Sequence, residues 1–234
     1  MSIENLNKIN AKQLISVYTS CGTDKVKFAE SYAKEFLPFF GKENLKIFEI
    51  GIRDGSSHRA WSHIFTNSKI YGIDIDERSL NQLGCENFKF EIFDQGDINK
   101  LQNFAENYGP FDIIIDDGSH FVEHMTTSFE CLIDYLNPGG IYVIEDIGCT
   151  YLNDYHNDAK NMSFPWGQNL NKMESGNKRQ DFIDFTEKIL ENIHISEWPK
   201  GREGKLTEKS DQVYEKISQY KNIIFVHKRK DIGE

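Results

Sequence analysis

Short apolar runs that end in acidic and turn residues recur along much of the chain. The clearest is FDIIIDDGSH, in which an apolar run at residues 111–115 leads into two aspartates, a glycine, a serine and a histidine. Continuous apolar runs of this length are typical of strands that are buried on both faces of a parallel sheet. The pattern predicts such strands over residues 47–50, 69–76, 88–97, 111–115 and 141–146.

Helical spacing of apolar residues predicts helices between and after these strands. They are expected over residues 98–108, 121–136 and 181–194, the second being closed by the Pro-Gly-Gly turn at 138–140. The last apolar runs, within residues 213–230, predict two strands joined by a tight turn. These two strands would form an antiparallel hairpin at one edge of the sheet.

The N-terminal residues 11–40 are also predicted to be helical, with an interruption at Cys21–Lys25. Gly22 would end the first helix, and Thr23 or Asp24 would cap the next. The second helix, roughly residues 26–40, carries four aromatic side chains at helical spacing: Phe28, Tyr32, Phe36 and Phe39. We expect this aromatic face to pack over the sheet.

Together these elements predict an α/β, Rossmann-like fold with a mostly parallel central sheet, flanking helices and a C-terminal antiparallel hairpin. The 234 residues are expected to form a single domain, with residues 1–40 as a helical cap. Residues 148–180 are polar and rich in turn residues, so they are predicted to form a lid or acceptor-binding loop. The aromatic residues Tyr151, Tyr155 and Trp166 in this loop would suit the face of a sugar, or would pack on the loop itself.

The first strand leads into a glycine turn with the spacing Glu49-x-Gly51-x-x-x-Gly55, followed by Ser56. Glycines let a ligand approach the backbone closely, and the N-terminus of the following helix offers free N–H donors. The spacing does not fit the G-x-G-x-x-G dinucleotide fingerprint, which disfavours a nicotinamide dehydrogenase. It fits the acidic-x-G-x-x-x-G turn of proteins that bind S-adenosylmethionine (SAM).

Acidic residues at the ends of the second and third strands are candidates for the rest of such a cofactor. Asp74 lies where an acid often binds ribose hydroxyls, and Asp76 competes for that role. Asp94 and Gln95 would meet an adenine edge or would simply form the turn.

Two neighbouring strands deliver further acids to the same edge of the sheet. Asp116, Asp117 and His120 follow one strand, and Glu145 and Asp146 end the next. Ligands bind beyond the carboxyl ends of such strands, and buried acids need compensation by a cation, a ligand or hydrogen bonds. Carboxylate oxygens from Asp117, Glu145 and Asp146 would suit Mg²⁺. The alternative is the rim of a cofactor pocket without metal.

Composition excludes several function classes. A formal net charge of −10 argues against a nucleic-acid binder, which relies on basic residues to neutralise phosphates. The four cysteines include no CxxC pair, so they suit reduced thiols better than disulfides or zinc. The polar N-terminus lacks a signal peptide, and no apolar run approaches the length of a membrane span. The expected location is the cytoplasm, without a membrane partner.

The motifs EIGIRDGSS, GIDID, FDQGD, FDIIIDDGSH and PGGIYVIED, in this order and spacing, resemble class I SAM-dependent methyltransferases. More narrowly they are similar to the macrocin and mycinamicin group of sugar O-methyltransferases, which carry a GTDK element upstream. EDIGCTY is similar to that group's ED-x-x-x-x-Y continuation. The resemblance covers roughly residues 21–151 and the final hairpin, and it implies SAM as cofactor and a small-molecule sugar acceptor.

The resemblance also implies roles for individual residues. For the cofactor, it implies that Glu49 and Gly51 hold the amino-acid end of SAM, with Gly55, Ser56 and Asp116 at the same pocket. Asp74 would bind the ribose and Asp94 with Gln95 the adenine, while Lys25 and Tyr32 would close over the cofactor.

For the reaction, the resemblance implies Mg²⁺ on Asp117, Glu145 and Asp146, with His120 as general base. His124, one helical turn further along, is the alternative base. Catechol or small-phenol methylation, and a SAM-fold protein without transferase activity, remain as alternatives. The loop over residues 152–180 matches no pattern of the group, so the resemblance does not identify the acceptor. A homo-oligomer is compatible with the sequence.

Overall fold

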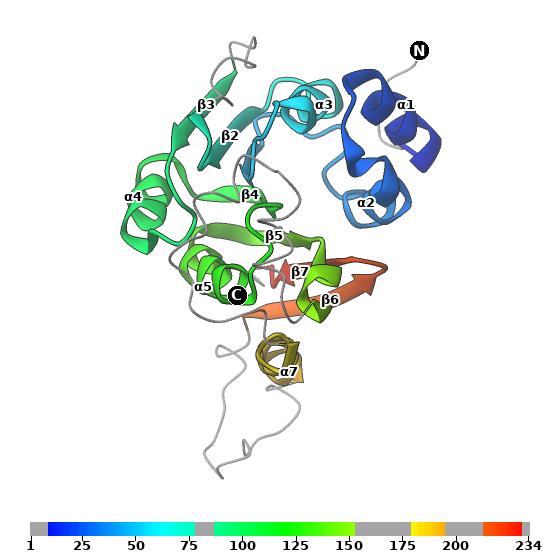
Figure 1. The fold of residues 1–234 in the computed structure, drawn as a ribbon. Coiled ribbons are helices and arrows are strands. Elements are labelled where there is room, and N and C mark those ends of the chain that lie inside the picture. Colours follow the sequence, from blue (N-terminus) through cyan, green and yellow to red (C-terminus); the bar gives the residue numbers. More distant parts are fainter. Residues whose placement is uncertain (1–8, 78–86, 153–178, 195–212, 231–234) are drawn as a thin grey trace.

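A computed structural model describes residues 9–77, 87–152, 179–194 and 213–230 of the chain (Figure 1). These residues form one seven-stranded sheet with the strand order β3-β2-β1-β4-β5-β7-β6. Pairing is parallel from β3 to β5, whereas β7 runs antiparallel to both β5 and β6. The strands are β1 Lys46–Ile50, β2 Lys69–Asp74, β3 Phe88–Ile92, β4 Phe111–Asp116, β5 Leu136–Glu145, β6 Tyr214–Tyr220 and β7 Ile223–Lys228. The predicted mostly parallel sheet and its C-terminal hairpin are confirmed.

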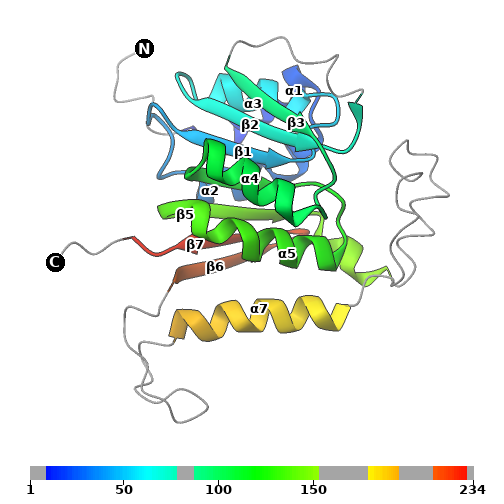
Figure 2. The same cartoon turned by 90° about the vertical axis from the view of Figure 1, so that its left-hand side faces the viewer.

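Helices cover both faces of the sheet (Figures 1 and 2). One face carries α1 Ala11–Cys21, the 3₁₀ helix η2 Asp24–Phe28, α2 Ala29–Glu35 and α3 Ser56–Ile64. The other carries α4 Ile98–Tyr108, α5 Val122–Leu132 and α7 Arg179–His194. Two short 3₁₀ helices, η4 Ile133–Tyr135 and η5 Ile147–Tyr151, flank β5.

Each face of the sheet has its own apolar core. Strand β4 supplies both, because Ile113 and Ile115 belong to the core under α1–α3 whereas Phe111 and Ile114 belong to the core under α4, α5 and α7. All four are fully buried. A strand covered on both faces needs apolar residues at every position, which explains the continuous apolar run in the sequence.

The N-terminal helices begin and end where the sequence provides caps, although the second is shorter than predicted. Asn10 forms a capping box with Gln13 at the start of α1, and Gly22 ends it in the left-handed conformation. The prediction of one helix over residues 26–40 was wrong, because η2 precedes α2 and α2 ends at Glu35. Pro38 disfavours helical geometry at the residue before it, which is consistent with the early end. The aromatic face is nevertheless buried as expected.

The element around the Pro-Gly-Gly sequence also differs from the prediction. Helix α5 ends at Leu132 rather than 136, and residues 138–140 lie within β5 instead of closing the helix. Asn137 Nδ2 donates to Asp112 Oδ1 at 2.9 Å, beside an irregularity in the β4–β5 register. Strands β2 and β3 are shorter than predicted as well. No helix among the described residues is both long enough and apolar enough to cross a membrane.

Candidate active site

The carboxyl ends of four adjacent parallel strands, β2, β1, β4 and β5, share one edge of the sheet. Most of the polar residues selected from the sequence lie at this edge. Asp117 follows β4 directly and Asp146 follows β5 directly, so their side chains come together although 29 positions separate them in the sequence.

Lys25 lies among these acids and is fully buried, although it comes from the N-terminal segment. Its Nζ lies 2.9 Å from Asp117 Oδ2, 2.6 Å from Glu145 Oε1 and 3.0 Å from Glu49 Oε1. Burial alone would lower the pKa of Lys25, but the three carboxylates outweigh it and raise that pKa well above its ordinary value. One ammonium group therefore holds together acids delivered by β1, β4 and β5.

Glu145 is the most constrained of these acids. Lys25 and the Tyr32 hydroxyl both donate to its Oε1. Its Oε2 is also buried and has no hydrogen-bond partner among the residues that the structure describes. Burial and the charge of Asp117 raise the pKa of Glu145 to about 8, against the opposing effect of Lys25. A buried oxygen without a donor is costly, which makes Oε2 a natural contact for a cation or a ligand donor.

Asp117, His120 and Asp146 form a second grouping that could hold a metal ion, since one ligand atom from each lies within 4.8 Å of the others. His120 Nε2 is 3.9 Å from Asp146 Oδ2. Mg²⁺ prefers oxygen ligands, whereas imidazole is the more usual ligand of transition metals. The carboxylates of Asp117 and Asp146 therefore fit Mg²⁺. Glu145 is not part of this grouping, and its predicted role as a metal ligand stays a prediction.

Two residues that sequence reasoning missed hold Asp146. Lys27 Nζ lies 3.0 and 3.2 Å from its two carboxylate oxygens, and Asn222 Nδ2 donates to Oδ1 at 2.6 Å. Lys27 could have been noticed from the sequence, because it lies two positions after Lys25, which was already a candidate site residue. Asn222 sits in the hairpin turn, and only the antiparallel insertion of β7 beside β5 brings it to this edge.

Asp116 and Gln95, both predicted to bind the cofactor, pair with each other in the structure. Gln95 Nε2 lies 2.9 and 2.8 Å from the two carboxylate oxygens of Asp116, and its Oε1 accepts from the Ser119 amide at 3.0 Å. Both side chains are buried. Burial raises the pKa of Asp116 to about 7, although the hydrogen bonds from Gln95 oppose this. The pair thus fixes the loop after β4, and the predicted contact of Gln95 with adenine stays a prediction.

The glycine turn brings the backbones of two strand ends into contact. Gly51 has φ +92°, and a Cβ at this position would lie 2.2 Å from the Asp117 carbonyl oxygen. Only glycine fits here without displacing the loop that carries the acids. Gly55, also in the left-handed conformation, precedes α3, and the Ser56 amide at the start of that helix donates to Asp54 Oδ1 at 3.0 Å.

Glu49 lies at the end of β1, fully buried beneath this turn. Its Oε2 accepts hydrogen bonds from Ser57 Oγ at 2.8 Å and Trp61 Nε1 at 3.0 Å. Both donors come from α3, so Glu49 ties that helix to the sheet as well as facing Lys25. Its predicted role at the amino-acid end of SAM stays a prediction.

Asp74 ends β2 and holds the glycine turn from the other side. Its carboxylate accepts from the Arg53 amide at 2.6 Å and from the Asp76 amide at 2.8 Å. These bonds join the end of β2 to the glycine turn. Asp94 is exposed after β3, where its Oδ1 accepts from the Gly96 amide at 2.9 Å. Both acids lie at the expected strand ends, and their contacts with ribose and adenine stay predictions.

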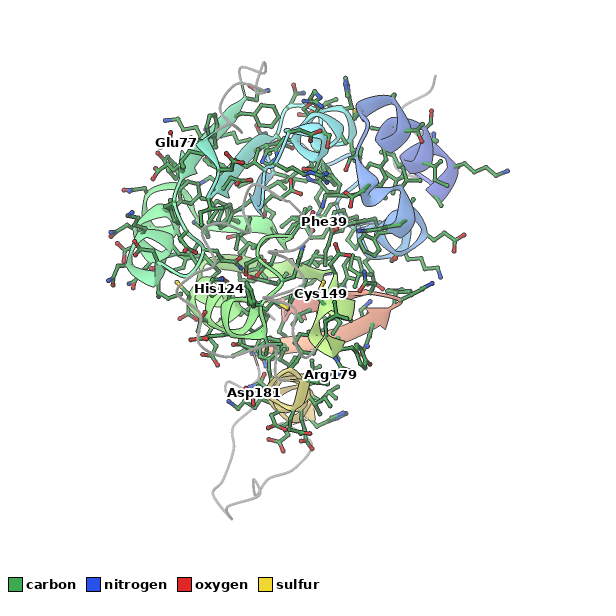
Figure 3. All side chains as sticks on the ribbon, viewed as in Figure 1. Phe39, Glu77, His124, Cys149, Arg179 and Asp181 are labelled. Atoms are coloured by element: carbon green, nitrogen blue, oxygen red, sulfur yellow. The ribbon has the colours of Figure 1, made fainter. Side chains whose placement is uncertain are left out.

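The two candidate bases have different surroundings. His120 is partly exposed, faces Asp146 and adopts a left-handed conformation with φ 59°. His124 lies on α5, where its Nδ1 is 2.8 Å from Ser119 Oγ (Figure 3). Burial lowers the pKa of His124, against the opposing charges of Asp94 and Glu123. The structure thus places His120 beside the acids and His124 against the supporting loop.

Among the predicted acceptor residues, Tyr151 is described and largely exposed at the end of η5. Arg179, at the start of α7, lies below η5 (Figure 3), with its Cζ 4.0 Å from the centre of the Tyr151 ring. Arg179 Nη1 also donates to Thr150 Oγ1 at 2.7 Å. Tyr155, Trp166 and most of the predicted lid lie outside the described residues.

The family model described as a methyltransferase domain matches residues 55–217, more than half of the chain. The chain belongs to this methyltransferase family. The Rossmann-like fold predicted from the sequence is confirmed.

Several curated O-methyltransferases are similar to the chain. Demethylmacrocin O-methyltransferase from Streptomyces fradiae is 30% identical over 208 residues, which are 86% of this chain and 48% of that protein. An 8-demethyl-8-α-L-rhamnosyl tetracenomycin-C 2′-O-methyltransferase from Streptomyces olivaceus is 28% identical over 88% of this chain and 51% of that protein. The chain therefore spans about half the length of these curated relatives.

A solved structure of the methyltransferase MycE from the mycinamycin biosynthetic pathway, in complex with Mg and SAH, is also similar. It superposes with a TM-score of 0.73 and 28% identity, covering 94% of this chain and 55% of MycE.

Proposed function

We propose that this chain transfers the methyl group of SAM to a hydroxyl of a sugar carried by a small molecule. The observation that carries the proposal is the cluster of acids and His120 at the carboxyl edge, on a fold whose named relatives are O-methyltransferases of glycosylated natural products. MycE, the similar solved structure, binds Mg and SAH, the product that SAM leaves after giving up its methyl group.

The glycine turn supports a SAM site. Gly51 and Gly55 let the chain turn tightly from β1 into α3, so the N-terminus of that helix lies at the same edge of the sheet. Asp74 fixes the turn through the Arg53 amide, so a ribose bound to its carboxylate would also be tied to the turn. Ligands of open α/β sheets bind in this position.

Asp117 and Asp146, which belong to one grouping of possible ligands, support a Mg²⁺ site. Glu145 is proposed as the third ligand because its buried Oε2 lacks a hydrogen-bond partner among the described residues. When bound, the cation supplies positive charge that makes a sugar hydroxyl easier to deprotonate and helps to orient it. Lys25 and Lys27 already donate to these acids, so they would offset part of the negative charge of the site before a cation arrives.

His120 is proposed as the general base. A sugar hydroxyl is a poor nucleophile because it keeps its proton at neutral pH, and imidazole is the side chain best suited to accept a proton near that pH. His120 lies beside Asp146, so an imidazolium formed during the reaction would be stabilised by a nearby carboxylate. The hydroxyl oxygen forms a bond to the methyl carbon, the sulfur–methyl bond breaks, and the proton passes to His120.

The test is calorimetric titration of the chain with SAM, with and without Mg²⁺, followed by methyl transfer to nucleotide-linked sugars, glycosylated natural products and catechols. We expect micromolar SAM binding and transfer to a sugar that EDTA abolishes. Asp146→Asn should bind Mg²⁺ more weakly and lose most of the Mg²⁺-supported transfer, because asparagine keeps the left-handed backbone but removes the charge. Asp134→Asn, an exposed acid on η4, is the matched control.

Each outcome has a distinct meaning. Methyl transfer only to catechols would contradict the sugar acceptor but support SAM-dependent O-methylation. Methyl transfer that EDTA does not change would contradict the proposed Mg²⁺ site. A chain without SAM binding would contradict the proposed function as a whole.

A further inference from the structure

Asn222 connects the C-terminal hairpin to the acids of the candidate site. It occupies the turn between β6 and β7 with φ 67°. Its Nδ2 donates to Asp146 Oδ1 at 2.6 Å, and its Oδ1 accepts from the Gly148 amide at 2.5 Å. Its backbone carbonyl accepts from the Ile147 amide at 3.3 Å. One residue therefore contacts three consecutive positions after β5.

The chain after β5 is shaped to receive this side chain. A Cβ at Gly148 would lie 2.5 Å from Asn222 Oδ1, so glycine is required for the contact. Asp146 itself has φ 52° and ψ 34°, a left-handed conformation that aspartate adopts more readily than most residues. With Oδ1 held by Asn222, Oδ2 lies 3.9 Å from His120 Nε2.

The hairpin that carries Asn222 is anchored to α2 by the buried carboxylate of Glu35. Tyr220, two positions before Asn222, donates to Glu35 at 2.6 Å, and Lys216 donates at 2.8 Å. His227 Nε2 lies 2.7 Å from the same carboxylate. Asn222 thus projects from a turn that is fixed at its base.

We propose that Asn222 is a positioning residue for Asp146, holding its carboxylate in the orientation that a divalent cation and His120 require. This rests on the proposed function, since that function gives Asp146 its role. A group that orients a metal ligand commonly changes metal affinity by about 10–100-fold when it is removed. The C-terminal hairpin is therefore part of the site, although it supplies no predicted ligand.

The decisive variant is Asn222→Gly, because glycine adopts φ 67° without strain and removes only the side chain. The matched control is Asn67→Gly, an exposed turn residue with φ 62°. Two measurements are made on each protein. The first is Mn²⁺ affinity, by electron paramagnetic resonance with SAM present. The second is hydrogen exchange of the Ile147 and Gly148 amides in metal-free protein.

We expect Asn222→Gly to bind Mn²⁺ at least about tenfold more weakly, with a melting temperature like that of the control. The Gly148 amide should exchange faster, while the Ile147 amide, whose acceptor is a backbone carbonyl, should not. Unchanged exchange at Gly148 would overturn the positioning role whatever the metal does. Faster exchange with unchanged Mn²⁺ affinity would overturn the link to the cation. A wild-type chain that binds no Mn²⁺ would instead contradict the metal of the proposed function, while the exchange data would still decide the positioning role.

Discussion

Buried charges dominate the site at the scale of single residues. Lys25 faces Glu49, Asp117 and Glu145 at 3.0 Å or less, and all but Asp117 are fully buried. Such a group is stable only when every charge has a partner, because one unpaired buried charge costs several kcal/mol. His120 stands at the more exposed side of these acids, which is where an acceptor hydroxyl could reach it.

We predict that His120→Ala lowers turnover by about 10²–10⁴-fold while SAM still binds, because only the proton acceptor is lost. The measurements are initial rates of methyl transfer and calorimetric titration with SAM. His63→Ala, an exposed histidine on α3, should leave both unchanged. Full activity of His120→Ala would contradict its role as general base. A loss of the same size in His124→Ala alone would assign the general base to His124.

At the scale of elements, the hairpin β6–β7 is joined to α2 through Glu35. Burial would raise the pKa of Glu35, but hydrogen bonds from Lys216 and Tyr220 lower it from its ordinary 4.5 to about 2. A carboxyl whose folded pKa is depressed stabilises the fold above its unfolded pKa and loses that contribution as pH falls. The stabilisation by Glu35 should therefore be complete above about pH 4.5 and disappear as pH approaches 2.

We predict that Glu35→Gln lowers the free energy of unfolding by about 1–3 kcal/mol at neutral pH, since hydrogen bonds to a charged group are weakened. The difference from wild type should shrink between about pH 4.5 and pH 2. Urea unfolding at a series of pH values measures it. Glu30→Gln, an exposed glutamate on the same helix, is the control. A difference that did not change with pH would show that packing rather than charge is responsible.

The elements show why sequence reasoning succeeded for strands and failed at some helix ends. Buried strands such as β4 leave a continuous apolar run, and α4 begins and ends where the pattern placed it. The end of α5 could not be found, because a 3₁₀ helix follows its last turn and the Pro-Gly-Gly sequence lies within β5, where the preceding Asn137 donates to Asp112. Such contacts depend on a strand 25 positions away in the sequence.

At the scale of the whole molecule, residues distant in sequence meet at one edge of the sheet. The strand order places Asp117 beside Asp146, so a shared acidic edge could be predicted from strand pattern alone. The resemblance predicted Lys25 near the cofactor, but the sequence could not show that its ammonium contacts three acids, because this depends on how the N-terminal segment packs. Nor could it show the contact of Asn222, which requires the inserted strand β7.

SAM should stabilise the whole fold, because its proposed contacts join the glycine turn, β2 and the N-terminal segment. We predict that SAM at about 100 times its dissociation constant adds about 2.7 kcal/mol to the free energy of unfolding. For a chain of this size that is a rise of about 5–10 °C in melting temperature. Thermal unfolding with and without SAM measures it.

The same measurement separates the two candidate ribose acids. Asp74→Asn should lose most of the shift, whereas Asp76→Asn should keep it. The reverse result would assign the ribose contact to Asp76. If SAM raised the melting temperature of both variants as much as that of the wild type, neither acid would bind the ribose.

Lys25 lies outside the part of the chain that the family model matches. The family match starts at residue 55, after Lys25 and Glu49, and ends at 217, before β7. A chain trimmed to those limits would keep Asp117 and Glu145 but lose their shared ammonium, and it would expose the β5 edge that β7 covers. Residues on both sides of the matched segment therefore contribute to this edge of the sheet: Lys25 and Glu49 before it, and β7 after it.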